Sequence, residues 1–203
     1  MSQDAFDLDS KTDMQIVAAY RRSGRPALHD VSGASLVLHC VYRGREAAAS
    51  ALVAAGHRSG VHESAAMGDV IRLRQFSETA PCTIDLLSPD GWTPLHLAAF
   101  FGRTSAVQYL VARGADARIW SRSFERNLPI HAAAAGRSTD LALIEALTPV
   151  SDVDAVQDEG YSALLIAASN GKKDWIEALA KAGADPDRRT KDGKRAADLL
   201  PRA

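Results

Sequence analysis

A short segment recurs three times in the second half of the chain and constrains the fold more than any other feature. The copies occupy residues 93–99, 128–134 and 162–168, with the sequences TPLHLAA, LPIHAAA and SALLIAA. Each copy is followed by a glycine, at Gly102, Gly136 and Gly171, so the spacing is 34 and then 35 residues. A fixed period of this size is typical of an array of small structural units rather than of one globular core.

Residues 93–114 illustrate the structure that each unit is expected to form. Thr93 can cap a short first helix, and Gly102 can end it because glycine adopts the left-handed conformation at low cost. Val107, Leu110 and Val111 then fall at the spacing of one face of a second helix. One such helix pair buries too little apolar surface to fold alone, so we expect neighbouring units to stack.

The pattern resembles the ankyrin repeat, in which T-P-L-H-x-A recurs at a period near 33 residues. Residues 90–99, with Gly102 and the segment 114–116, match it most completely, and the resemblance covers roughly residues 33–201. It implies an all-α fold, an ankyrin-repeat solenoid of about five helix-turn-helix units with a truncated C-terminal cap unit and an N-terminal capping helix. The expected division is a tail and capping helix at 1–32 and an ankyrin-repeat domain at 33–203, with units at about 33–58, 59–87, 88–122, 123–156 and 157–190 and a cap at 191–203.

Three places depart from the family pattern. The first unit has no room for the turn that normally joins units, so a tight loop is expected over Gly56–Gly60. The stretch Ala132–Gly136 is one residue short, and we expect the helix there to end early. Arg126 stands where the neighbouring units have Gly91 and Gly160, so a rearranged turn is expected, because glycine reaches positive φ cheaply.

The N-terminal region is less repetitive than the rest of the chain. Asp13–Arg22 is expected to form the capping helix, with Met14, Val17 and Ala18 as its apolar face. Residues 1–10 are expected to be disordered, as chain ends often are.

Composition limits the class of protein. The 203 residues carry 24 basic and 25 acidic side chains, which gives no general attraction to nucleic acid or anionic lipid. No apolar stretch approaches the roughly 20 residues needed to cross a bilayer, and the start is acidic where a secretory signal would be basic. Cys40 and Cys82 cannot form a disulfide framework. We therefore expect a cytoplasmic monomer that binds neither nucleic acid nor membrane.

The six histidines were the strongest reason to consider catalysis or metal binding. His62, His96 and His131 occupy one repeat position, and the resemblance implies a structural role there, in which the ring bonds backbone and links units. Metal-ligand spacings, nucleophile elbows and phosphate-binding loops are missing from the sequence. The sequence accordingly predicts no metal, no cofactor and no enzymatic activity.

The resemblance also supplies a binding surface, because turn tips and first helices of the family form a concave groove where partners usually dock. The corresponding positions are Tyr42, Arg43, Met67, Asp90, Trp92, Phe100, Phe101, Arg113, Phe124, Glu125, Asn127, Asp158, Glu159 and Tyr161. Aromatic residues are 6% of the chain but six of these fourteen positions. Aromatic and arginine side chains often anchor protein interfaces. The alternative is that some of these rings fold back onto the surfaces between repeats.

The sequence thus predicts a non-catalytic scaffold that binds an unknown partner protein in this groove. Two alternatives stay open: a structural spacer or self-association module, and an enzyme with its site in the N-terminal segment. Double substitution of Trp92 and Phe101 by alanine is expected to weaken binding while leaving the fold intact.

Overall fold

The computed structural model describes residues 10–24 and 35–201, and these residues form helices with short connections. The helices are α1 (Asp13–Ser23), α2 (Leu36–Tyr42), α3 (Glu46–Ala54), α4 (Val61–Met67), α5 (Val70–Thr79), α6 (Pro94–Phe100), α7 (Thr104–Ala112), α8 (Pro129–Ala135), α9 (Leu141–Leu147), α10 (Ala163–Ser169), α11 (Lys173–Lys181) and α12 (Ala196–Leu199), with 3-10 turns at Pro81–Thr83 and Thr148–Val150. The expectation of disorder for residues 1–10 falls, apart from Ser10, outside the described residues. So does part of the expected tail segment, residues 25–34.

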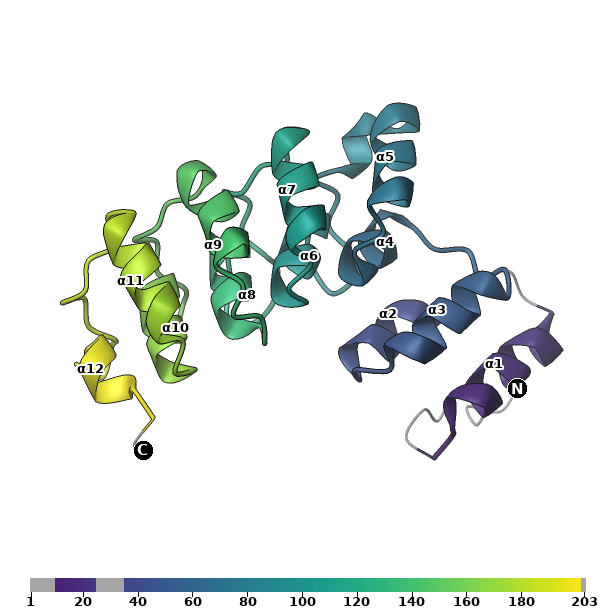
Figure 1. Ribbon diagram of the computed structural model, residues 1–203, viewed down its shortest axis with the longest axis horizontal. Coiled ribbons are helices and arrows are strands. Elements are labelled where there is room, and N and C mark those ends of the chain that lie inside the picture. The colour runs from purple at the N-terminus through teal and green to yellow at the C-terminus, as the bar shows by residue number, and fades with distance from the viewer. Residues whose placement is uncertain (1–9, 25–34, 202–203) are drawn as a thin grey trace.

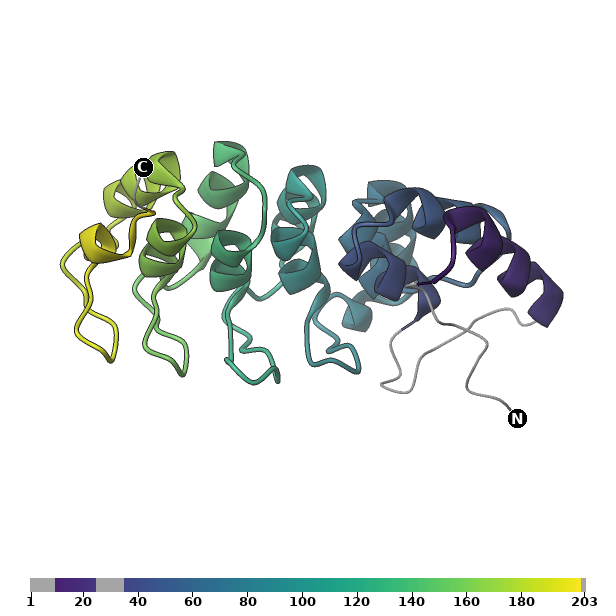
Figure 2. The same ribbon diagram turned by 90° about the horizontal axis from the view of Figure 1, so that it is seen from below.

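The helices stack as successive pairs along one axis (Figure 1), which confirms the predicted all-α solenoid. Seen at right angles, the loops that join the later pairs project from one side of the stack (Figure 2). The core is continuous from α4 to α12, and Ala98, Ala99, Ala133 and Ala134 are completely buried in it. Such small side chains allow the first helices of neighbouring units to pack closely.

The three equivalent histidines tie the first helix of a unit to the connection that leads to the next unit. Each ring places Nε2 near a backbone carbonyl between its own second helix and the next first helix: His62 to Leu86 at 2.7 Å, His96 to Asn127 at 2.9 Å and His131 to Ala155 at 2.9 Å. In His131 the other ring nitrogen accepts from the backbone N–H of Leu128, so Nε2 is the donor to Ala155. The predicted structural role of these histidines is confirmed.

A cation after the first-helix glycine makes a second link between units. Arg103 donates from Nε to the carbonyl of Ala66, at the end of α4. Lys172, which is 8% exposed, donates from Nζ to the carbonyls of Ala133 and Gly136 at 3.2 and 2.6 Å. Carbonyls at a helix C-terminus lack intrahelical partners, so these cations satisfy groups that the preceding unit leaves open.

The expectation that α8 ends early is wrong. α8 has seven residues, as do α6 and α10, and the missing residue is the one that separates the end of the helix from the glycine in the other two units. Gly136 caps α8 directly, with φ −64° and ψ 174°. A Cβ atom at Gly136 would lie 2.1 Å from the carbonyl oxygen of Phe100, so glycine is needed here for close approach to α6.

The turn at Arg126 is rearranged, as expected, but in its length and not at Arg126 itself. The bond from the backbone N–H of Ser121 to the carbonyl of Asn127 spans six residues, whereas the bond from Ser88 to Trp92 in the preceding tip spans four. Arg126 adopts φ 48°, inside the left-handed region that Gly91 and Gly160 occupy in the neighbouring tips. Its backbone N–H bonds the carbonyl of Ser123, just as Gly91 bonds Ser88. A residue with a side chain in this region costs about 1 kcal/mol in local backbone energy relative to glycine.

The N-terminal helices differ in direction from the rest of the stack. In Figure 1 the axes of α1, α2 and α3 are strongly inclined to those of α6 to α11. The expected short loop between α3 and α4 is present, since α3 ends at Ala54 and α4 begins at Val61. The first helix pair lacks the projecting turn that joins the later units. It packs on its neighbours at a different angle from that of the later pairs.

The expected capping helix is present as α1, but of its predicted packing face only Val17 packs against the core. α1 docks through Ile16 and Tyr20, which are 1% and 5% exposed. Met14 is 83% exposed, and Ala18 is also exposed. The helix carries apolar residues on more than one side, so periodicity alone did not identify the side that is buried.

Candidate partner-binding surface

Four aromatic side chains from two units form a continuous line of ring contacts. Tyr42, at the end of α2, meets Phe101 with ring centroids 5.2 Å apart, although α2 and α6 belong to different units. Phe101 contacts Phe100 at 5.2 Å, and Phe100 contacts Trp92 at 5.4 Å, all in edge-to-face geometry. This geometry is favourable for aromatic pairs. The line therefore holds the first and third units together and fixes the orientation of each ring.

Tyr42 is anchored by the turn tip of the third unit. Its hydroxyl donates to Oδ2 of Asp90 at 2.7 Å, and Asp90 also accepts from the hydroxyl of Ser88. Burial of the phenol, together with the bond to Asp90 and its negative charge, raises the pKa of Tyr42 well above its ordinary value. The hydroxyl is therefore protonated at physiological pH and can donate to Asp90.

The aromatic line borders a groove of about 520 Å³ among the ends of α2, α6 and α8. It is lined by Val41, Tyr42, Arg43, Gly44, Glu46, Phe100, Phe101, Ala135, Gly136 and Arg137. Glu46 is paired with Arg103 at 2.6 Å, so this carboxylate is already neutralised. Arg43 and Arg137 are exposed, and the groove, called the basic groove below, therefore presents positive charge beside aromatic rings.

A second groove, of about 410 Å³, lies toward the C-terminal end of the same array. It is lined by Glu125, Gln157, Glu159, Tyr161, Ile166, Ser169, Asn170, Lys191 and Asp192. Lys191 donates to the backbone carbonyl of Asp158. Glu125 and Glu159 are exposed on the rim of the groove. This acidic groove has the opposite charge from the basic groove.

The structure distributes the fourteen predicted positions unevenly. The basic groove takes Tyr42, Arg43, Phe100 and Phe101, and the acidic groove takes Glu125, Glu159 and Tyr161. Trp92 and Asp90 support the basic groove from the tip through the contacts described above. Asp158 is exposed at its tip and Phe124 is 88% exposed at the preceding one.

Three predicted positions lie elsewhere. Asn127 is only 6% exposed, and its backbone carbonyl receives the His96 bond, so its place in the predicted surface is corrected to a supporting one. Met67 is half-buried and packs against the N-terminal core. Arg113 follows the second helix α7 and lines neither groove.

Several rings also contribute to the core, as the alternative had allowed. Trp92 and Phe101 are half-buried and pack against the core around α1 to α3. Replacing both by alanine would therefore remove core contacts as well as surface, which corrects the expectation of an intact fold.

Sequence reasoning missed Arg137, the residue that brings α8 into the basic groove. The available signal was its place directly after a first-helix glycine, which Arg103 and Lys172 share. The side chains of Arg103 and Lys172 donate to backbone carbonyls of the preceding unit, whereas the side chain of Arg137 is exposed. That difference depends on the altered loop after α8 and cannot be read from the spacing.

The described residues offer little for other kinds of site. Within residues 10–24 and 35–201, no three His, Cys, Asp or Glu side chains gather in a way that could hold a metal ion. No helix in the described part of the chain is both long and apolar enough to cross a bilayer.

Comparison with known proteins places the repeats in context. An ankyrin-repeat family profile matches residues 90–121 and 159–191. Human transient receptor potential cation channel subfamily A member 1 is 26% identical over 134 residues, 66% of this chain and 12% of that protein. Human neurogenic locus notch homolog protein 4 is 35% identical over 95 residues, 47% of this chain and 5% of that protein. The chicken nuclear factor NF-kappa-B p105 subunit is 30% identical over 130 residues, 63% of this chain and 13% of that protein. The chain thus spans only a small part of these relatives.

Proposed function

Because this chain belongs to the ankyrin-repeat family, we propose that it is a non-catalytic scaffold that binds a segment of a partner protein along its first helices and turn tips. The observation that carries the proposal is the aromatic line Tyr42–Phe101–Phe100–Trp92, which borders a groove while staying partly accessible. Repeats of this family generally mediate protein–protein interaction, and the partner and its place of docking are the proposed part.

The proposed mechanism is rigid presentation. The ring contacts, the bond from Tyr42 to Asp90 and the ion pair of Arg103 with Glu46 already hold the basic groove in place. Little side-chain entropy is then lost when a partner docks, which leaves more of the contact energy as affinity.

Charge gives the bound segment a direction. The basic groove favours an acidic part of the partner beside the aromatic line, and the acidic groove favours a basic part near Glu125 and Glu159. We infer a partner segment with opposite charges at its two ends, acidic toward α2 and basic toward α10.

The alternatives differ in what they require. Self-association would need a complementary face on a second copy, and we propose a cytoplasmic monomer instead. An enzyme in the N-terminal segment would need a reactive group there, such as His39 of α2 or His29, which lies outside the described residues. Loss of a measured turnover on His29→Ala or His39→Ala would favour that alternative over the scaffold.

Affinity capture from cells with quantitative mass spectrometry tests the proposal when it is run on matched variants. Arg137→Glu and Glu159→Lys change exposed groove residues, and Gln108→Glu changes an exposed residue on α7 as the control. A partner that is retained by the wild type and the control but lost by both groove variants supports the scaffold. Equal retention by all four proteins would place binding elsewhere.

A further inference from the structure

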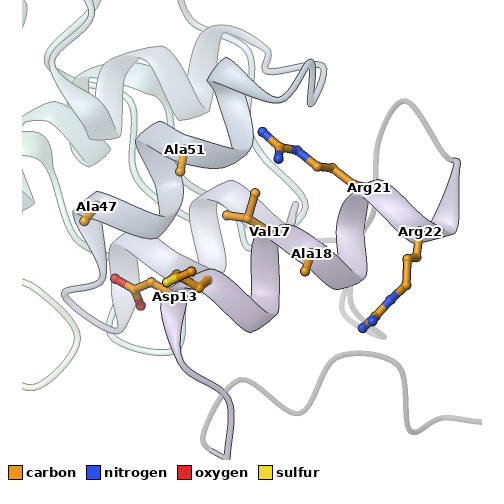
Figure 3. Close-up of a pocket in the computed structure, with 8 residues that line it drawn as sticks. Asp13, Val17, Ala18, Arg21, Arg22, Ala47 and Ala51 are labelled. Carbon is orange, nitrogen blue, oxygen red and sulfur yellow. The ribbon is translucent and has the colours of Figure 1, made fainter.

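A second accessible surface lies on the N-terminal helices, away from both grooves described above. A hollow of about 690 Å³ runs between α1 and α3, and apolar groups dominate its lining (Figure 3). Met14, Val17 and Ala18 of α1 and Ala47 and Ala51 of α3 line it. None of these residues belongs to the basic or the acidic groove, so the surface, called the α1–α3 groove below, is independent of the proposed function.

Helix α1 has two apolar faces, and packing among the described residues buries one of them. Ile16 and Tyr20 are buried against the stack, whereas Met14 is 83% exposed on the other face. A helix that is apolar on both sides is normally covered on both sides. An accessible methionine is moreover a side chain that adapts its shape to different partners.

The shape of the α1–α3 groove suits a helix. Ala18, Ala47 and Ala51 have small side chains, so a third helix can approach the two that form the walls to a normal interaxial distance of about 8–10 Å. With 11 residues, α1 offers roughly 16 Å of length, about three turns of a docked helix.

Charge indicates which kind of helix fits. Arg21 and Arg22 are exposed at the C-terminal end of the groove, and neither has an ion-pair partner among the described residues (Figure 3). Asp13, at the other end, is already paired with Arg45 at 2.7 Å. The groove therefore combines an apolar floor with positive charge that no acidic side chain of the described residues neutralises.

We propose that the α1–α3 groove docks an amphipathic, acidic helix of a partner protein, with its leucine-sized side chains over the alanines and its carboxylates beside Arg21 and Arg22. Two arginines at one end orient the helix, since carboxylates pair with guanidinium groups in bidentate geometry. The array would then hold one partner on its groove face and another at its N-terminal end.

Two synthetic helical peptides of about 18 residues, long enough to form a helix in water, serve as probes. Both carry leucine on one face; the first carries glutamate elsewhere and the second carries lysine. Fluorescence anisotropy measures their binding to the full chain. The glutamate peptide is expected to bind at least about tenfold more tightly than the lysine peptide, because only its charges complement Arg21 and Arg22.

Variants distinguish the groove from nonspecific attraction. Arg21→Glu with Arg22→Glu should reverse the order of the two peptides, and Ala51→Gln should weaken both at least about tenfold by filling the floor. Circular dichroism verifies that these variants keep the wild-type helix content. Arg137→Glu, in the basic groove, should leave peptide binding unchanged, so failure here and failure of the proposed function are separable.

Five results would overturn the proposal. Equal binding of the two peptides, or binding that is insensitive to Ala51→Gln, would remove the α1–α3 groove as the site. Binding only by a chain that lacks residues 1–9 would make the protein's own N-terminal segment the occupant. Dimerisation that Ala51→Gln abolishes in sedimentation equilibrium would make the occupant a second copy. Absence of binding by both the full and the shortened chain would refute the docking site altogether.

Discussion

Acid should weaken the stack through its buried histidines, and His96 allows the size of the effect to be worked out. Its ring is completely buried, and this burial lowers the pKa of His96 from 6.5 to about 4, although the bond to Asn127 opposes the shift. Between pH 6.5 and 4 the unfolded chain therefore binds a proton that the folded chain does not. The free energy of unfolding falls as pH falls through this window.

The magnitude follows from the size of the shift. Each pKa unit corresponds to about 1.4 kcal/mol, so His96 alone should remove about 3 kcal/mol of stability between pH 6.5 and 4. The effect is fully developed below pH 4 and absent above pH 6.5. Burial also lowers the pKa of His131, which adds to the loss in the same direction.

Urea unfolding at pH 7 and pH 4, followed by circular dichroism, measures this loss. His96→Gln keeps a donor and an acceptor but cannot take up a proton, so its loss should be about 3 kcal/mol smaller than that of the wild type. Gln108→Asn, which changes an exposed residue of α7 that does not titrate, is the control and should keep the wild-type loss. Equal losses in the wild type and His96→Gln would refute the assigned role of the buried ring.

Three further predictions concern the connections between units. Arg126→Gly should raise the free energy of unfolding by about 0.5–1 kcal/mol, because glycine adopts φ 48° without strain; a lower denaturant midpoint would contradict this. Gly136→Ala should lower the free energy of unfolding by more than about 2 kcal/mol, because its Cβ would meet the carbonyl of Phe100. Gly60→Ala is the control and should lower it by less than about 1 kcal/mol, because its Cβ would meet only a flexible side chain. Burial lowers the pKa of Lys172 from 10.5 to about 8. Between pH 8 and 10.5 the unfolded chain therefore binds a proton that the folded chain does not, and the stability of the wild type should rise with pH in this range. Thermal unfolding of Lys172→Met should show no such rise.

The sequence predicts correctly those structural features whose cause lies within one unit or at one boundary between units. The capping threonine, the glycine after the first helix and the linking histidine act within a unit or across one boundary, so the repeat itself reveals them. Two details could not be read from one unit. Arg126 adopts a left-handed backbone although it is not glycine, and the constraint at Gly136 is the carbonyl of another unit.

The basic groove illustrates a different obstacle. Residues 41–44 and 135–137 lie about ninety positions apart in the sequence, yet they line the same hollow. They meet because the first helix pair is inclined to the rest of the stack, as Figure 1 shows. An inclination of this kind depends on how a missing turn is accommodated in three dimensions, and the length of the gap alone does not specify it.

Site-specific photo-crosslinking tests the central claim most directly, because it reports which face of the array touches the partner. A photoreactive residue is placed at Arg137 in the basic groove or at Gln108 on α7, both of which are exposed. The account predicts a crosslinked partner from position 137 and none from position 108. Crosslinking from position 108 with none from 137 would contradict binding along the first helices.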